Sequence, residues 1–185
     1  MKHHSYYTLT VSGLVAALLC VLGPLTVPIG PIPVSLMTLA LYVTSYVLGP
    51  RESLTSLVVY LLLGAAGLPV FSGYQGGLAK LAGPTGGYLV GYLFLTLLCS
   101  TAAEHTHRRA AGVLAGMALG TAVLYAFGTA WFMLETGTAL WGALSLCVFP
   151  FLPIDLGKMA VALLLGRSTR SALEKAHLLP EQCKE

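Results

Sequence analysis

Residues 109–134 read RAAGVLAGMALGTAVLYAFGTAWFML, an apolar run with no charged side chain after Arg109. A helix of roughly 20 apolar residues crosses a hydrocarbon core about 30 Å thick, so this run is long enough to span a bilayer. Only helices and closed barrels satisfy the backbone in lipid, and the run lacks the period-two alternation of a strand. It therefore predicts a transmembrane helix.

Similar apolar runs fill most of the 185 residues, and Gly/Pro pairs such as Gly49-Pro50 and Gly83-Pro84 separate several of them. Proline fixes φ and lacks an amide hydrogen, so these pairs are expected helix boundaries. We predict an all-α, polytopic membrane protein that forms a single transmembrane domain over residues 1–185, a bundle of six helices. The predicted helices cover residues 8–24, 34–49, 52–67, 85–103, 109–134 and 141–166.

The composition favours lipid, not water, around the outer surface. Hydrophobic residues make up 56% and charged residues 9% of the chain, against about 25% charged in an ordinary globular domain. So few charges cannot cover a water-facing surface, and membrane lipid is the expected surrounding. The basic residues form no cluster with interleaved aromatics, so we expect no nucleic-acid partner.

The distribution of lysine and arginine predicts the orientation in the membrane. With six helices, one side holds eight cations, while the other side holds only Lys80 and a further lysine lies within a helix. By the positive-inside rule, both termini are expected in the cytoplasm, together with the tail 167–185. The eight cations are Lys2, Arg51, Arg108, Arg109, Arg167, Arg170, Lys175 and Lys184.

The loop 68–84 is then expected to face outward. A loop this long and rich in glycine is usually a cover over a binding site or a mobile tether. Its apolar residues, among them Val70, Phe71 and Leu78, favour a cover that packs on a pocket. Lys80, the one outward cation of this prediction, is placed to meet a carboxylate that enters from outside.

The segment Phe149-Pro150-Phe151-Leu152-Pro153-Ile154-Asp155-Leu156-Gly157-Lys158 carries the strongest functional signal. Proline suits the first turn of a helix, and Asp155 and Lys158 are three residues apart, so they share a helix face. Ionisable groups inside a membrane cost at least about 2.5 kcal/mol each and normally face the bundle interior. We interpret the pair as a polar anchor for a ligand; the alternative is a self-neutralising pair that only fixes helix packing.

Helical rise places this pair in the outer half of the membrane. Lys158 stands nine residues before Arg167, the expected cytoplasmic edge, which is about 14 Å at 1.5 Å per residue. Asp155 lies about 18 Å from the same edge. The pair, the loop 68–84 and Lys80 are therefore expected to converge on one pocket that opens to the exterior.

Two stretches rich in small residues are weaker signals. Gly83-Pro84-Thr85-Gly86-Gly87-Tyr88 opens the fourth predicted helix, where glycine permits close backbone approach. In the first helix, Ser12 with Ala16 and Gly13 with Ala17 are small residues four apart, a pattern that lets another helix approach closely. That helix would contact either the rest of the bundle or a partner.

No motif for catalysis is present. The cysteines and histidines match no metal or redox spacing, no serine has a matching His/Asp pair, and no nucleotide-binding motif occurs. We therefore expect no enzyme activity, no catalytic residue, no metal and no cofactor.

Several of these segments resemble the biotin-specific substrate-binding component (S component, BioY) of energy-coupling-factor transporters. The resemblance runs in order through most of the chain, from about residue 8 to 166. It is carried by Gly30-Pro31-Ile32-Pro33-Val34-Ser35-Leu36, Leu48-Gly49-Pro50-Arg51, Gly67-Leu68-Pro69-Val70-Phe71-Ser72-Gly73, Gly83-Pro84-Thr85-Gly86-Gly87-Tyr88 and Pro150-Phe151-Leu152-Pro153-Ile154-Asp155-Leu156-Gly157-Lys158. One position departs, because the family commonly shows glutamine where this chain has Met37, so the resemblance implies no polar contact from that position.

The resemblance implies a protein of the cytoplasmic (inner) membrane of a prokaryote that binds biotin from outside. It also implies partners, namely a transmembrane coupling subunit, which would contact the small residues of the first helix, and two ATPase subunits that hydrolyse ATP. In that family the Asp and Lys of the last motif belong to the ligand site, which here means Asp155 and Lys158.

Biotin chemistry agrees with this site. An aspartate accepts from the two ureido N–H groups, and a lysine donates to the ureido carbonyl. The remaining candidate contacts come from the outward loop and the start of the fourth helix. They are Phe71, Tyr74 and Tyr88 for the rings, with Lys80 and Gln75 as polar partners.

Three other interpretations remain open at this point. The first is a sister component for thiamine or riboflavin, although a flavin site should show more aromatic stacking surface. The second is a membrane scaffold without a ligand. An intramembrane enzyme is a distant third.

Overall fold

The computed structural model describes residues 2–27 and 33–176, and most of this part of the chain is helical. The helices are α1 Lys2–Leu22, α2 Met37–Val47, α3 Pro50–Ala65, α4 Leu78–Ala82, α5 Gly86–His105, α6 Ala110–Thr136, α7 Leu140–Cys147 and α8 Leu152–Lys175. Strands β1 Thr26–Val27 and β2 Val34–Ser35 pair in antiparallel fashion. The all-α class expected from the sequence is confirmed, with one small hairpin added.

The last predicted helix, 141–166, is a pair of helices. α7 and α8 are bent by 41° at the break between them. Pro150 and Pro153 lie in and just after this break, where proline removes a backbone donor and disfavours helix at the preceding residue. α8 then continues to Lys175, so residues 167–175, predicted as part of a tail, are helical.

Other bounds also differ from the prediction. α1 begins at Lys2, not near residue 8. The loop 68–84 contains the short helix α4 and an isolated antiparallel bridge between Phe71 and Gln75, so it has local structure of its own.

Among the described helices, α5 and α6 are long and apolar enough to cross a membrane. The bent pair α7–α8 makes a third span if it is counted as one. The part of α1 over Thr8–Leu22 and the whole of α2 are apolar but shorter.

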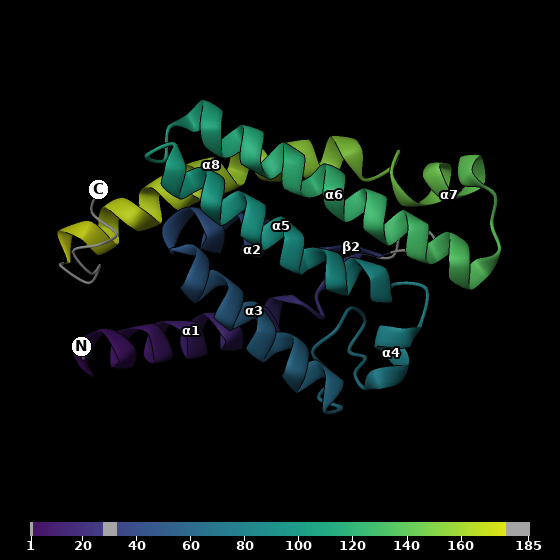
Figure 1. Cartoon of the computed structure of the whole chain (residues 1–185), viewed down its shortest axis with the longest axis horizontal. Helices are drawn as coiled ribbons and strands as arrows, with labels where there is room; N and C mark the ends of the chain where they lie inside the picture. Colours follow the sequence, from purple (N-terminus) through teal and green to yellow (C-terminus); the bar gives the residue numbers. More distant parts are fainter. Residues whose placement is uncertain (1, 28–32, 177–185) are drawn as a thin grey trace.

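α2 lies at the centre of the bundle, and most of its side chains are buried. It packs against α8 and α5, while α1 packs on α3 and α3 on α5 (Figure 1). α5 and α6 form the most extensive helix pair. A Cβ at Gly120 of α6 would lie 3.1 Å from the Leu95 carbonyl oxygen of α5, so glycine is what lets these two backbones approach.

The two ends of the bundle carry different elements (Figure 1). The hairpin, α4 and α7 lie at one end, which we call the hairpin end. The start of α1, the loop between α5 and α6 and the last turns of α8 lie at the other, which we call the terminal end.

Candidate functional site

A cavity lies among the helices toward the hairpin end. It offers about 70 Å³ to the centres of water molecules, several times the roughly 10–15 Å³ that one buried water needs. Its walls come from nearly every part of the described chain. They comprise Gly23, Pro33, Ser35, Met37, Thr38, Tyr60, Ser72, Thr85, Tyr88, Leu89, Tyr92, Leu124, Tyr125, Cys147, Phe151, Asp155 and Lys158.

The start of α8 positions the charged pair. Pro153 occupies the first turn, and the backbone N–H of Asp155 donates to the carbonyl of Phe151 at 2.8 Å, which sets the helix geometry. Asp155 and Lys158 then stand on one helix face, with the ammonium nitrogen 3.0 Å from Oδ1 of the carboxylate. Asp155 is only 4% exposed. A charge buried this deeply is costly unless it is paired and hydrogen-bonded, as it is here.

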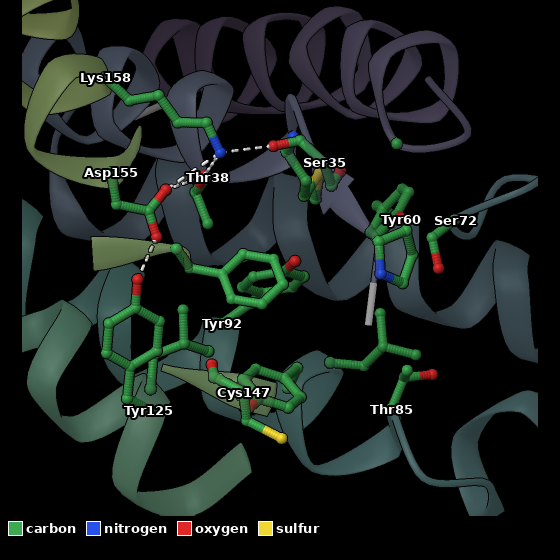
Figure 2. A pocket seen from close by; sticks show the side chains of 17 residues that line it. Ser35, Thr38, Tyr60, Ser72, Thr85, Tyr92, Tyr125, Cys147, Asp155 and Lys158 are labelled. Atoms are coloured by element: carbon green, nitrogen blue, oxygen red, sulfur yellow. Dashed lines mark hydrogen bonds and ion pairs between the residues drawn. The ribbon is translucent and has the colours of Figure 1, made fainter. Parts of the chain in front are cut away.

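The side chain of Lys158 in α8 extends to β2 and to α2 (Figure 2). Besides Asp155, its Nζ donates to the carbonyl oxygen of Ser35 at 2.8 Å and to Oγ1 of Thr38 at 2.9 Å. An ammonium has three N–H donors, so these three acceptors satisfy it completely. The lysine thereby connects α8 to the hairpin and to α2.

The two carboxylate oxygens of Asp155 have different partners (Figure 2). Oδ1 accepts from Lys158 and from the hydroxyl of Thr38 at 3.3 Å, while Oδ2 accepts from the hydroxyl of Tyr125 at 2.6 Å. A carboxylate oxygen has two lone pairs, so Oδ2 retains room for a second donor. The site can therefore accept an N–H group from a ligand without losing an existing contact.

The rest of the cavity wall is mostly aromatic or aliphatic. The rings of Tyr60, Tyr88 and Tyr92 lie along it, together with Met37 and Leu89. A small number of convergent polar groups in an otherwise apolar cavity is typical of a small-molecule site. Such a site suits a ligand with a compact polar head and an apolar ring.

Of the predicted site residues, Asp155, Lys158 and Tyr88 line this cavity. The hydroxyl of Tyr88 donates to the carbonyl of Cys147 at 3.5 Å, which links α5 to α7. The ring of Tyr88 lies against Gly128 of α6. Tyr88 therefore forms part of the cavity wall, and its ring packs against α6.

Lys80, Gln75 and Tyr74 lie outside the cavity, in a hollow of the loop region. This hollow and the cavity share Pro33 and Ser72 in their walls, so the two are adjacent. Partial burial lowers the pKa of Lys80 below its ordinary value. Tyr74 is 66% exposed and does not close over the cavity.

Phe71 does not line the cavity either, in contrast to the prediction. Its side chain is 0% exposed, and its ring meets that of Tyr60 edge-on with centroids 5.6 Å apart. It also fills the space beside Gly64 of α3. Phe71 therefore packs against Tyr60, and it is Tyr60 that lines the cavity.

The small residues of α1 face two directions. Ser12 and Ala16 are buried, and Oγ of Ser12 donates to the carbonyl of Glu52 in α3 at 3.4 Å. Gly13 and Ala17 are exposed. Successive helix positions differ by about 100°, so the two pairs cannot share one face. Ser12 and Ala16 therefore pack within the bundle, which was one of the two alternatives for this helix, and the partner contact that the family resemblance implied for all four residues does not hold for these two.

Sequence reasoning missed Ser35, Thr38, Tyr92 and Tyr125 as parts of the site. The two tyrosines were detectable as hydroxyl groups inside apolar runs, where a buried hydroxyl needs a partner. Nothing local indicated that Tyr125 in α6 would meet Asp155 in α8. Among the described residues, no three His, Cys, Asp or Glu side chains are grouped so that they could hold a metal ion.

Comparison with known proteins gives consistent matches. The sequence model of the BioY family matches residues 1–175. The biotin transporter BioY2 of Lactococcus lactis subsp. cremoris is 35% identical over 94% of this chain and 95% of its own length. The biotin transporter BioY of Thermotoga maritima is 35% identical over 84% and 90%, respectively.

A solved structure agrees with the fold. It is described as the S-component for biotin from an ECF-type ABC transporter. It superposes with a TM-score of 0.84 and 28% identity, covering 92% of this chain and 94% of that one.

Proposed function

The chain belongs to the BioY family, and we propose from this premise that it captures biotin as the substrate-binding subunit of an energy-coupling-factor transporter and serves biotin uptake. The observation that carries the proposal is the buried Asp155–Lys158 pair, placed in the wall of a mostly apolar cavity. Membership of a transporter family supports a role in binding and not in catalysis.

The ureido head of biotin fits the polar corner of the cavity. Its N–H groups are donors, and Oδ2 of Asp155 has one unfilled acceptor position beside Tyr125. The thioether ring of biotin would lie among the tyrosine rings and Met37. The Met37 side chain supplies apolar contact there and no hydrogen bond.

The ureido carbonyl requires an exchange at Lys158. All three donors of the ammonium are already used, two of them by the neutral oxygens of Ser35 and Thr38. A ligand carbonyl replaces a neutral acceptor at lower cost than it replaces the carboxylate, because the charge-assisted contact is the stronger one. Biotin binding would thus loosen Lys158 from the hairpin or from α2.

The carboxylate tail of biotin is assigned to Lys80. The hollow that contains Lys80 adjoins the cavity through Pro33 and Ser72, so a tail that leaves the cavity there meets a cation and the amide of Gln75. Partial burial of the lysine strengthens its attraction for an anion relative to a fully solvated one.

Replacement of Lys80 by glutamine is expected to weaken biotin binding by about tenfold, the worth of one hydrogen bond to a charged group. The methyl ester of biotin lacks the tail charge, so it is expected to bind the wild type and the variant equally. Calorimetric titration of both ligands measures the difference. Equal losses for acid and ester would contradict the assignment of the tail to Lys80.

Six membrane spans with both termini in the cytoplasm belong to the same proposal, as does residence in the cytoplasmic membrane of a prokaryote. In support, the start of α1 and the end of α8 lie together at the terminal end. The same end carries the described cations Arg108, Arg109 and Arg167, whereas Lys80 belongs to the hairpin end. By the positive-inside rule, this asymmetry supports a cytoplasmic position for the terminal end.

A transmembrane coupling subunit and two ATPase subunits are the proposed partners. The face of α1 with Gly13 and Ala17 remains available for the coupling subunit, since both residues are exposed and a Cβ at Gly13 would meet nothing within 4 Å. Exposed Leu14 and Leu18, one position further along the sequence, widen this face around the helix.

A thermal-shift measurement in detergent tests the ligand itself. Biotin at a hundredfold excess over its Kd is expected to raise the free energy of unfolding by about 2.7 kcal/mol. Thiamine and riboflavin are expected to give no shift at the same concentration. A shift from one of them but not from biotin would identify a sister component, and no shift from any vitamin would favour the scaffold interpretation.

A further inference from the structure

A basic hollow lies at the terminal end, far from the biotin cavity along α8. It is formed by three elements: the end of α2 with Tyr46, the loop between α5 and α6 with His107 and Arg108, and the last turns of α8. α8 contributes Arg167, Arg170 and Glu174. Arg170 stands twelve residues after Lys158, which is about 18 Å of helical rise.

Two of these arginines are held in place by the end of α2. Nη1 of Arg170 donates to the carbonyl of Val47 at 3.1 Å, and Nε of Arg108 donates to the carbonyl of Tyr46 at 3.0 Å. The last carbonyls of a helix lack partners within the helix and carry partial negative charge, so cations are favoured there. Arg170 is 7% exposed, which makes it a buried, ordered guanidinium.

The backbone of the loop contributes to this placement. His107 and Arg108 have φ of 48° and 55°, both in the left-handed region that non-glycine residues rarely adopt. Such conformations persist where surrounding contacts determine them. The N–H of Arg108 donates to the carbonyl of Ala103 at 2.8 Å, which anchors the loop to the end of α5.

Among the residues that the structure describes, the hollow has a surplus of positive charge even when Arg108 is left aside. Arg167 and Arg170 face one carboxylate, Glu174, which pairs with Nε of Arg170 at 2.9 Å and is half exposed. Capping of α2 accounts for Arg108 and Arg170 but not for Arg167. Within residues 2–27 and 33–176, Arg167 has no hydrogen bond or ion pair, although it lines the same hollow.

We propose that this hollow binds a phosphate-bearing anion, with Arg167 and Arg170 as its principal contacts. The planar guanidinium fork matches the oxygens of a phosphate and donates two hydrogen bonds at once. Basic pockets between helices at the cytoplasmic side of a membrane are suited to anionic headgroups. The anion is either the headgroup of an anionic phospholipid or free phosphate, because both present the same chemistry.

The test uses the full-length protein in a neutral detergent. Native mass spectrometry measures retention of phosphatidylglycerol, and thermal unfolding measures stabilisation by phosphatidylglycerol or by inorganic phosphate at constant ionic strength. The variant is Arg167→Gln, which leaves the contacts of Arg170 with α2 in place. The matched control is Arg51→Gln, an exposed arginine at the start of α3 and outside the hollow.

Arg167→Gln is expected to weaken phosphatidylglycerol binding by about fivefold, the worth of one arginine near an anionic surface. Arg51→Gln is expected to leave it unchanged, and both variants are expected to bind biotin as the wild type does, which confirms folding. An effect of inorganic phosphate that also depends on Arg167 identifies the free anion as a ligand, whereas an effect of the lipid alone identifies the membrane as its source. Equal losses in both variants, or no loss in Arg167→Gln, would overturn the proposal.

Discussion

Replacement of Asp155 by asparagine is expected to weaken biotin binding on the order of a hundredfold, since it removes a charged acceptor from the ligand. It is also expected to lower the free energy of unfolding by about 3 kcal/mol, because the Lys158 ammonium stays buried without its counter-ion. The amide oxygen would turn toward Lys158, and its NH2 group toward the hydroxyl of Tyr125. A donor would then stand where biotin needs an acceptor.

A double variant separates the binding role of this pair from its structural role. Asp155→Leu combined with Lys158→Met removes both charges at similar volume, and such replacements of buried ion pairs are often neutral or stabilising. The double variant is therefore expected to unfold at a higher temperature than Asp155→Asn while biotin binding stays lost. Biotin titration and thermal unfolding in detergent give both quantities. Wild-type affinity in a folded Asp155→Asn protein would remove Asp155 from the site.

Replacement of Gly128 by valine is expected to change the shape of the cavity by displacing the ring of Tyr88. A Cβ at this position would collide with Cε1 and Cδ1 of the Tyr88 ring. The ring must therefore move away from α6, and because Tyr88 lines the cavity, this movement changes the shape of the cavity. The hydrogen bond from Tyr88 to the carbonyl of Cys147 is lost in that movement.

The expected loss of biotin affinity for Gly128→Val is at least about tenfold, or 1.4 kcal/mol. The expected loss of unfolding free energy is about 1–3 kcal/mol, the usual cost of overpacking. Ala126→Val is the matched control, because it places the same side chain on the exposed face of α6. If the two valine variants bound biotin equally well, Tyr88 would not be a wall that the ligand depends on.

The sequence predicted helices well where apolar runs were long. α5 and α6 coincide closely with the predicted segments 85–103 and 109–134. Prediction failed in joining residues 141–166 into one helix, because hydropathy alone does not show the break between α7 and α8. Pro153 was expected in the first turn of a helix, and it lies in the first turn of α8. The hairpin was also missed, since two pairs of strand residues are too short to show a period of two.

For the site, the intramembrane charges were the strong signal. Burying an aspartate and a lysine is so costly that their presence within an apolar run is enough to indicate a site. The aromatic predictions were less successful, since Phe71 lies behind the wall and Tyr74 is exposed. An aromatic residue in a loop has no local feature that shows whether it faces the ligand or the core.

The amino-acid sequence by itself determined that this chain is a helical membrane protein with a charged pair near the start of its last helix. Both conclusions follow from the energy of transferring side chains into lipid, which depends on residue type and spacing along one helix. Only the tertiary structure decided the partners of that pair. Thr38 and Tyr125 lie 117 and 30 residues from Asp155 in the chain, and the packing of α2 and α6 against α8 brings their hydroxyls to one carboxylate. Hydrogen bonds form over about 3 Å, so the contacts of this site depend on helix packing and not on the local pattern of any helix.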